Sequence, residues 1–410
     1  MRENWRKNIS LFLFGQALSV TGSMLTGYAI LWYIVLQTGS GSAMSVYVVA
    51  TFLPMFLISP IGGVWADYYN RKHLINLADG SIALVSLITA LIIYAGFVNH
   101  WILLICAALR AAFQGVHSPA INSFIPLITP KDKLEKINGF NQSIQSFAMI
   151  ASPMIAGMLL SIYPLEAIFF LDIITAAIGI FIVYFLVKTP PQTNKEKPRF
   201  TKIDYFKDLR ESAQYIKDHK FIKELIVVSI ILFIAFSPSA FLTPLQTARN
   251  FGEEYWRLSA IEIAWSAGML LGGIGVGIYA GFKNRAYTIA LSCAFMGCGA
   301  ILLGVLPAFI PYLAAMFLTG MAFPYYNVPI TTLLQKKTDP AQIGRVFGVF
   351  NMVATLIFPS GMLIFGPLAD IVNIDYLMIA SGIAICFLAL LFVGDGEIKA
   401  AAASEAVERA

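Results

Sequence analysis

Four charged side chains lie inside long apolar stretches of this sequence: Asp79, Arg110, Asp172 and Glu262. A charge in such surroundings costs several kcal/mol unless it faces a cavity or an opposite charge. The chemistry open to these residue types is acid–base chemistry, because a carboxyl group can take up or release a proton while a guanidinium keeps its charge. Arg110 therefore indicates a functional position, with a structural role as the alternative.

Other kinds of chemistry have no supporting pattern in the sequence. No glycine-rich run ends in Lys-Ser or Lys-Thr, so ATP is not expected to act directly. Four histidines are scattered across loops and span ends without metal spacing: His73, His100, His117 and His219. Four cysteines fall inside apolar runs and are expected to be buried free thiols: Cys106, Cys293, Cys298 and Cys386. We expect no catalytic residue, metal, cofactor or nucleic-acid partner, and the chain is not expected to be an enzyme.

The composition indicates which elements must position the charged residues. Of the 410 residues, 58% are hydrophobic and 12% are charged, about half of the roughly 25% charged residues of soluble domains. Apolar runs of about 20 residues match a hydrocarbon core of about 30 Å, and such runs exclude a transmembrane β-barrel. The sequence predicts an all-α membrane protein.

Twelve transmembrane helices are expected, with the run nearest the N-terminus read as an uncleaved first span. They lie near 9–36, 42–66, 73–97, 101–127, 138–163, 165–187, 221–247, 258–281, 286–306, 310–335, 346–370 and 375–393. The one long polar stretch divides them into six and six. The predicted division is a six-helix bundle at 1–187, a cytoplasmic central loop at 188–220, a second six-helix bundle at 221–393, and a cytoplasmic tail at 394–410.

An internal repeat supports two related halves. Phe113, Pro119, Pro130 and Asn141 recur as Phe323, Pro329, Pro340 and Asn351 at a constant offset of 210. Two bundles related by an axis along the membrane normal are typical of transporters, whose site lies near the midplane between the halves.

The loops differ strongly in positive charge. All but three of the 28 Lys and Arg residues fall on one side of the predicted membrane, and the exceptions are Arg110, Arg249 and Arg257. Because cytoplasmic loops carry the excess of Lys and Arg, we expect a multi-pass protein of the cytoplasmic membrane with both termini in the cytoplasm.

The second span ends in the motif Gly63-x-x-x-Asp67-x-x-Asn70-Arg71-Lys72. It resembles the loop 2–3 signature of the major facilitator superfamily, G-x-x-x-D-x-x-G-R-[RK]. A neighbouring helix is expected to approach closely at Gly63, and Asn70, which replaces a glycine, is expected to form a left-handed turn. The resemblance implies that Asp67 faces the N-terminus of span 11 and controls, with Arg71, the cytoplasmic gate. Ordinary positive loop charge is the alternative.

Two further motifs resemble those of drug/proton antiporters in this superfamily. Arg110-Ala-Ala-Phe-Gln114-Gly115 is similar to R-x-x-Q-G with one extra residue, and in the antiporters that arginine is linked to proton transfer. The proton carrier would then be an acid, in the order of preference Glu262, Asp172 and Asp79. The second motif is similar to G-P-x-x-G-G, with generic helix packing as its alternative; its residues here are Ser152, Pro153, Ala156 and Gly157.

Polar and aromatic side chains form candidate walls of a central substrate cavity. The polar candidates are Gln16, Asn141, Gln142, Gln145 and Asn351, and the aromatic candidates are Tyr28, Trp32, Phe236, Tyr325 and Tyr326. A wide, weakly polar pocket of this kind suits bulky lipophilic molecules. Contacts between helices are the alternative for the polar set, and core packing is the alternative for any single aromatic residue.

Three phrases resemble the bacterial macrolide-efflux branch of the superfamily over nearly the whole chain. They are Gly139-Phe-Asn-Gln-Ser-Ile-Gln-Ser, Arg110 with the following His117-Ser-Pro119, and Ala260-Ile-Glu262-Ile with Gly268-Met-Leu-Leu-Gly-Gly. The resemblance implies proton-coupled efflux of a lipophilic, macrolide-like drug by alternating access. Its expected partners are that small lipophilic substrate, protons and membrane lipid, and the expected oligomeric state is a monomer. A lysophospholipid flippase or siderophore exporter of the same fold is the alternative, and a polytopic enzyme or receptor without transport is a remote one.

Overall fold

The computed structural model describes residues 5–189, 210–212, 214–279, 282, 284–339 and 342–394, and all regular elements there are helical. The first six long helices are α1 (Trp5–Thr38), α2 (Gly41–Tyr68), α3 (Arg71–Tyr94), α4 (His100–Ile128), α5 (Leu134–Leu160) and α6 (Leu165–Phe181). A 3₁₀ turn at Lys131–Lys133 precedes α5, and a π-helical turn at Ile182–Leu186 extends α6.

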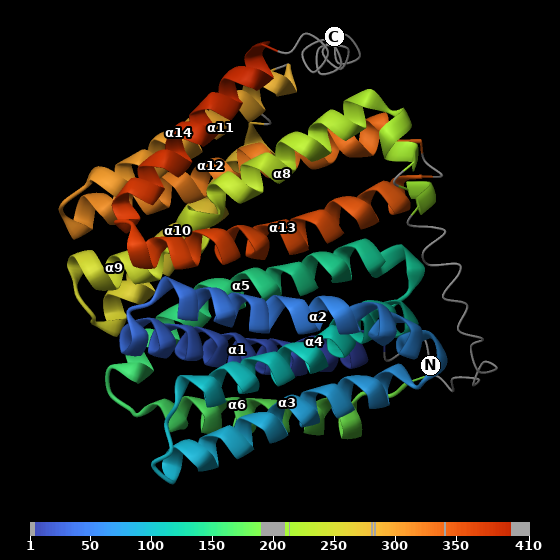
Figure 1. Ribbon diagram of the computed structural model, residues 1–410. Coiled ribbons are helices and arrows are strands. Elements are labelled where there is room, and N and C mark those ends of the chain that lie inside the picture. Colours follow the sequence, from blue (N-terminus) through green and yellow to red (C-terminus); the bar gives the residue numbers. More distant parts are fainter. Residues whose placement is uncertain are drawn as a thin grey trace. The chain divides into compact units, whose positions relative to one another are not determined.

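The second set of helices begins after the central segment. It consists of α8 (Lys220–Phe241), α9 (Thr243–Phe251), α10 (Tyr255–Ile278), α11 (Arg285–Val305), α12 (Phe309–Lys337), α13 (Ile343–Ile371) and α14 (Ile374–Gly394). Figure 1 shows these helices coloured along the chain, from green in α8 to red in α14.

The helices are long and apolar enough to cross a bilayer. Within the described residues, eleven segments meet that criterion, with α8 and α9 counted as one segment, Lys220–Phe251. The 29-residue α12 covers the remaining predicted span. Eleven of the predicted spans therefore each coincide with one helix, the span 221–247 is divided between α8 and α9, and the all-α membrane fold is confirmed. Helices dominate because lipid offers no hydrogen-bond partner to an unpaired backbone group.

Two compact units make up the chain. Unit 1 consists of the described residues of Met1–Thr38, Val46–Arg199 and Glu254–Ser259, and unit 2 of those of Gly39–Ser45, Phe200–Glu253 and Ala260–Ala410. The first residues of α2 thus belong to unit 2, and the first residues of α10 belong to unit 1. Most of the predicted central loop and nearly all of the predicted tail lie outside the described residues, so the predicted domain boundaries stay a prediction.

The core of unit 1 forms where α1, α3 and α4 meet. Phe12 of α1 and Phe124 of α4 are fully buried, with ring centroids 4.8 Å apart. α1 packs against α5 and α6, while α3 packs against α4 and α6. This arrangement brings polar residues of α1, α3, α4 and α6 toward one another.

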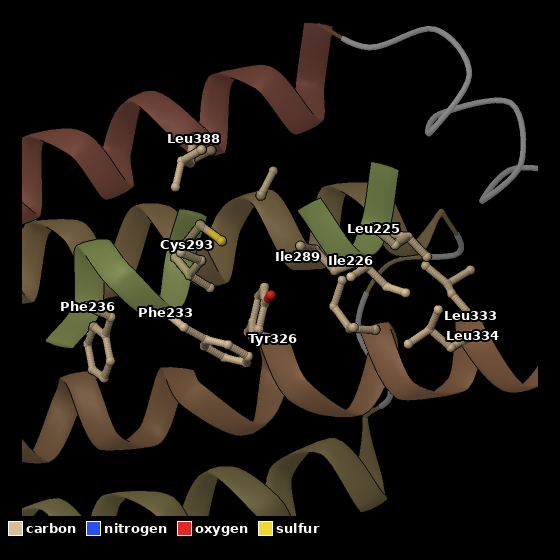
Figure 2. Packing of buried hydrophobic residues seen from close by; sticks show 14 of the residues in the cluster. Leu225, Ile226, Phe233, Phe236, Ile289, Cys293, Tyr326, Leu333, Leu334 and Leu388 are labelled. Carbon is tan, nitrogen blue, oxygen red and sulfur yellow. The ribbon is translucent and has the colours of Figure 1, made fainter. Parts of the chain in front are cut away.

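The core of unit 2 forms between α8, α11, α12 and α14. Figure 2 shows Phe233 and Phe236 of α8, Cys293 of α11 and Tyr326 of α12 within this core. The hydroxyl of Tyr326 donates a hydrogen bond of 2.9 Å to Ser229 Oγ. Because a buried hydroxyl needs a partner, this bond lets a tyrosine occupy an otherwise apolar core.

Many large apolar side chains point away from these cores. Leu77 on α3, Ile105 on α4 and Phe295 on α11 are each more than half exposed. Water would oppose such exposure, whereas hydrocarbon accepts it without cost. The exposed apolar surface agrees with a multi-pass membrane protein.

Candidate functional site

A buried ion pair joins α4 to α6 in unit 1. Arg110 Nη1 lies 2.5 Å from Asp172 Oδ2, and the side chains are only 9% and 1% exposed. Ser86 of α3 hydrogen-bonds to both partners: its hydroxyl accepts from Arg110 Nη1 and donates to Asp172 Oδ2 over 2.8 Å. Ser23 of α1 donates to Asp172 Oδ1 over 3.4 Å. Four helices therefore hold one carboxylate and one guanidinium in place.

A second polar cluster joins three of these helices, α1, α3 and α4. Asp79 of α3 and His117 of α4 are 3% and 2% exposed, and His117 Nε2 lies 3.1 Å from Asp79 Oδ1. Ser19 of α1 donates a hydrogen bond of 2.9 Å to the same oxygen. The cluster thus places an imidazole next to a carboxyl group, two side-chain types that often take part in acid–base chemistry.

Helix geometry explains why the two clusters form together. Asp79 and Ser86 are seven residues apart on α3, and Arg110 and His117 are seven residues apart on α4. Seven residues make about two turns, so each pair shares one face of its helix, about 10 Å apart along the axis. Ser86 meets Arg110 while Asp79 meets His117, as expected where the two helices run antiparallel.

Both clusters border a cavity of about 270 Å³ inside unit 1. Asp79, Arg110, Gln114 and His117 line it, together with Gln145 of α5. The rest of the wall is mainly apolar, with Val20, Met24, Met55 and Ile82 among the lining residues. The cavity thus combines an apolar wall with a few charged groups, which is typical of small-molecule sites.

Close helix contact at Gly22 brings α1 to α6. A Cβ atom at Gly22 would collide with Thr175 Oγ1 and lie 3.2 Å from Asp172 Oδ1. Glycine is therefore needed there so that α1 can reach the carboxylate.

The loop 2–3 motif lies at the end of α2, where Arg71 Nη2 is 3.9 Å from Asp67 Oδ1. Arg71 Nε donates to the carbonyl of Ala66 over 2.8 Å, and Lys72 Nζ donates to the carbonyl of Val187 over 2.7 Å. The motif thus fixes the turn between α2 and α3 and links it to the segment after α6. Its gating role stays a prediction.

Two expectations for this motif are wrong. Asn70 has φ −64° and forms the N-cap of α3, accepting hydrogen bonds from the amides of Lys72 and His73, so no left-handed turn occurs there. The close approach lies at Gly62, where a Cβ would meet the carbonyl oxygen of Gly115 at 2.6 Å, whereas a Cβ at Gly63 would have open space. An asparagine side chain can satisfy free amides of a helix start, and this favours the cap over the turn.

The four residues of the α5 motif pack closely within unit 1. Ser152 Oγ donates to the carbonyl of Thr21 over 3.2 Å, and the Pro153 carbonyl accepts from Ser259 Oγ over 2.9 Å. Ala156 is fully buried, and a Cβ at Gly157 would collide with Ser259 Oγ. Small residues therefore bring α5 close to α1 and to the start of α10.

The predicted cavity residues divide by location. Gln145 lines the cavity of unit 1, whereas Trp32, Phe236 and Tyr326 are at most 1% exposed and lie in the protein interior. Gln16 is buried, and its side-chain amide has no hydrogen-bond partner among the described residues. The others lie in less buried positions: Tyr28 stacks obliquely on Trp32, Tyr325 borders an apolar pocket of unit 2, Asn141 is half-buried, and Gln142 and Asn351 are exposed.

The structure corrects two further expectations. His117 lies in the middle of α4 and is buried, not at a span end. Cys106 and Cys293 are buried free thiols as expected, but Cys386 is half-buried and Cys298 is exposed. No cluster of potential metal ligands occurs among the described residues. Glu262, the first choice as proton carrier, is half-buried on α10 in unit 2.

His117 is the residue that sequence reasoning missed. The signal was available in the two seven-residue spacings on adjacent spans, which place one acid, one base and their partners on facing surfaces.

Among the described residues, a multi-pass helical fold with charged groups around a cavity is typical of membrane transporters. The chain belongs to the major facilitator superfamily, whose family model matches residues 12–361. It is 28% identical to macrolide efflux protein A of Streptococcus pyogenes over 400 residues, which cover 97% of this chain and 98% of that protein.

More distant relatives agree with this assignment. The chain is 25% identical to the multidrug efflux pump Tap of Mycobacterium bovis over 407 residues, covering 95% of this chain and 91% of that protein. A crystal structure of a mutant of the nucleoside transporter NupG matches with a TM-score of 0.68 at 14% identity, over 95% of this chain and 99% of that one. At this identity the structural likeness concerns the fold alone.

Proposed function

We propose that this protein exports a lipophilic, macrolide-like small molecule across the cytoplasmic membrane of a bacterium in exchange for protons. The names of the efflux relatives support the direction and the kind of substrate. The observation that carries the proton coupling is the Arg110–Asp172 pair, which is buried beside a cavity and bound by hydroxyl groups.

Protonation of Asp172 would change the forces on α4. As a carboxylate, Asp172 balances the charge of Arg110 and accepts hydrogen bonds from Ser86 and Ser23. A proton on Asp172 removes that balance and leaves a buried guanidinium without its counter-charge, which is strongly unfavourable in low dielectric. The pair is thus an element whose preferred arrangement depends on one proton, as coupling to alternating access requires.

The loop 2–3 motif provides the proposed cytoplasmic gate. Asp67 is well exposed, while Arg71 is anchored to the backbone carbonyl of Ala66. An exposed carboxylate can therefore engage or release a partner while the turn that carries it stays fixed.

Drug accumulation in cells tests the proposal. A susceptible bacterial strain expressing the wild-type protein should accumulate less labelled erythromycin than the empty strain, and a protonophore should abolish the difference. Arg110→Ala and Asp172→Asn should each reduce export at least tenfold, while both variants still insert in the membrane. Asp132→Asn serves as the matched control, because Asp132 is an exposed acid of unit 1 that pairs with the neighbouring Lys133.

The outcomes separate the candidate functions. Export that persists after collapse of the proton gradient would contradict antiport. Unchanged accumulation of a panel of macrolides and dyes, together with translocation of a lysophospholipid in vesicles, would favour the flippase.

A further inference from the structure

A groove of about 440 Å³ lies between α1, α5 and α6 in unit 1, apart from the cavity that holds the charged clusters. Phe140 and Phe147 of α5 line it and are each more than half exposed, and Ala17 and Leu18 of α1 form the facing wall. Gln145, which borders the charged cavity, lies on nearly the opposite face of α5. Because exposed aromatic rings on a membrane span are covered by hydrocarbon, the groove opens toward lipid.

The hydroxyl groups in the groove are all satisfied by their own helices. They belong to Thr21, Ser143 and Thr175. Each donates to a backbone carbonyl three or four residues earlier, over 2.7, 3.0 and 2.9 Å respectively. Hydrocarbon can therefore lie against these side chains without leaving a donor unpaired. The wall thus suits an apolar chain better than a polar ligand.

One end of the groove carries two lysines. Lys7 of α1 precedes Leu18 by eleven residues, and Lys136 of α5 precedes Phe147 by the same number. Eleven residues make about three turns, so each lysine lies on the face of its helix that lines the groove. Both lysines are exposed, and Lys136 Nζ lies 5.8 Å from the ring centroid of Phe140.

The two lysines lie at the same end because α1 and α5, the first and fifth spans, cross the membrane in the same direction. Ser152 Oγ donates to the carbonyl of Thr21 over 3.2 Å. Counting back from this contact along both helices places Lys7 beside the first turns of α5. The described first turn of α1 contains no acidic residue, and Asp132, just before α5, pairs with Lys133 at 3.2 Å. This end of the groove is therefore positively charged.

We propose that the groove binds an anionic phospholipid, with one acyl chain between α1, α5 and α6 and the phosphate near Lys7 and Lys136. The positive end of the groove is the end predicted to lie at the cytoplasmic surface, where anionic lipids attract basic side chains. The apolar wall accounts for the chain and the lysines account for the charge of the headgroup. This lipid is a partner of the protein, distinct from the exported molecule, and its binding does not depend on drug export.

Native mass spectrometry of the purified full-length protein in detergent tests the proposal. The probes are phosphatidylglycerol and phosphatidylcholine with identical acyl chains, so that only the headgroup charge differs. One phosphatidylglycerol should be retained per protein, at least tenfold more tightly than phosphatidylcholine. The preference should shrink as the ionic strength rises, because salt screens exposed charges.

Variants separate the headgroup contact from the chain contact. Lys7→Gln and Lys136→Gln should each weaken binding of phosphatidylglycerol about fivefold, and the double variant about thirtyfold. Neither change should alter the affinity for phosphatidylcholine. Ser143→Phe places a large ring in the groove and should weaken binding of both lipids at least tenfold.

Unit 2 offers matched controls for both kinds of change. Lys336→Gln combined with Lys337→Gln removes the same charge from exposed positions at the end of α12. Ser360→Phe adds the same ring at another exposed serine, whose hydroxyl also bonds to its own helix, over 2.7 Å. Both controls should retain the two lipids as the wild type does, and monodisperse elution shows which variants are folded.

Three results would overturn the proposal. Equal retention of the two lipids by the wild type, or unchanged affinity for phosphatidylglycerol in the double lysine variant, contradicts the phosphate contact. Unchanged retention of both lipids by Ser143→Phe contradicts the place of the chain. Displacement of the bound lipid by erythromycin would assign the groove to the exported molecule instead.

Discussion

The contribution of the Arg110–Asp172 pair to stability can be measured separately from its proposed role in transport. Removing one partner leaves an unbalanced buried charge, so Arg110→Ala or Asp172→Ala alone should destabilise the protein by about 3–5 kcal/mol. The double variant removes both charges and should be more stable than either single variant. Export should be reduced at least tenfold in all three, because each lacks the proposed proton-coupling pair. Thermal unfolding in detergent and drug accumulation provide the two measurements.

If the double variant is no more stable than the less stable of the two single variants, the two side chains contribute independently to the stability of the protein. Restored export in the double variant would return Arg110 and Asp172 to a structural role. Arg110→Lys is a useful companion, since lysine keeps the charge but has one nitrogen in place of the two that make contacts. In Arg110, Nη1 donates to Ser86 and Asp172 while Nη2 donates to the carbonyl of Ser23 over 3.4 Å.

The N-cap role of Asn70 predicts effects of substitution on stability that differ from those that the loop 2–3 motif implies. As the N-cap of α3, its side chain accepts from the amides of Lys72 and His73. Asn70→Ala should cost about 1 kcal/mol, Asn70→Asp should be nearly neutral, and Asn70→Gly should cost a few tenths of a kcal/mol. Thermal unfolding of the four proteins measures the order. A large gain in stability with glycine would instead indicate the left-handed turn.

For single residues, the sequence indicated which charged side chains belong to the candidate site, but not which side chains they contact. Arg110, Asp79 and Asp172 stand out because charges are rare in apolar spans. Their partners depend on helix rotation and on which spans are neighbours, and neither is encoded near the residue itself. This is why His117 looked like a span-end histidine, although it lies two turns from Arg110 on the same face of α4.

The packing of α1 against α6 depends on Gly22, and this gives a matched pair of substitutions on one helix. A Cβ at Gly22 would collide with Thr175, whereas a Cβ at Gly27 would meet only Tyr47 Oη at 3.7 Å. Gly22→Ala should destabilise the protein by about 1–3 kcal/mol through overpacking and reduce export by displacing Asp172. Gly27→Ala should be neutral or slightly stabilising, because alanine is the better helix former.

Thermal unfolding and drug export of the two alanine variants test this packing argument. If Gly22→Ala is as stable and exports as well as Gly27→Ala, α1 and α6 can separate without affecting the ion pair.

The first turn of α2 is held by Asp370 of α13 within unit 2. The carboxylate accepts from the amides of Gly41 and Ser42 over 2.6 and 2.9 Å and from Ser40 Oγ over 2.9 Å. A carboxylate is favoured at a helix N-terminus, where free amides and the helix dipole are positive. Asp370→Ala should therefore lower stability by about 2 kcal/mol.

The unfolding temperature in detergent measures the effect of Asp370→Ala, with the exposed Glu253→Ala as control. Asp370→Asn should retain part of the stability, since an amide oxygen still accepts hydrogen bonds. An unfolding temperature for Asp370→Ala equal to that of the wild type would mean that solvent satisfies these amides equally well.

The elements themselves were the most predictable level of the structure. Each predicted span is helical because a bilayer leaves backbone groups few other ways to pair. Prolines inside α2, α4 and α12 did not end these helices, as expected where neighbouring helices support the backbone. The division of α8 from α9 at Leu242 was not predicted, since Pro244 at the start of α9 permits either a break or a continuing helix.

For the molecule as a whole, composition was sufficient to determine the fold class, whereas the candidate site could be assembled only from the tertiary structure. An apolar fraction of 58% leaves few alternatives to a helical membrane protein. The site depends on a small number of polar residues whose alignment across four helices follows from glycine contacts and helix register. A one-residue change of rotation, about 100° around a helix, would turn such a residue from the cavity toward lipid.

The distribution of positive charge predicts how the entire chain is oriented in its membrane. All but three Lys and Arg residues belong to one set of loops, and loops rich in these residues stay in the cytoplasm. A green fluorescent protein fused after Ala410 should therefore fluoresce, and alkaline phosphatase fused there should be inactive. Alkaline phosphatase fused after Glu253, between α9 and α10, should be active, because that segment is predicted to lie outside. The reverse pattern at both positions would invert the orientation and place the proposed gate at Asp67 and Arg71 on the outer side of the membrane.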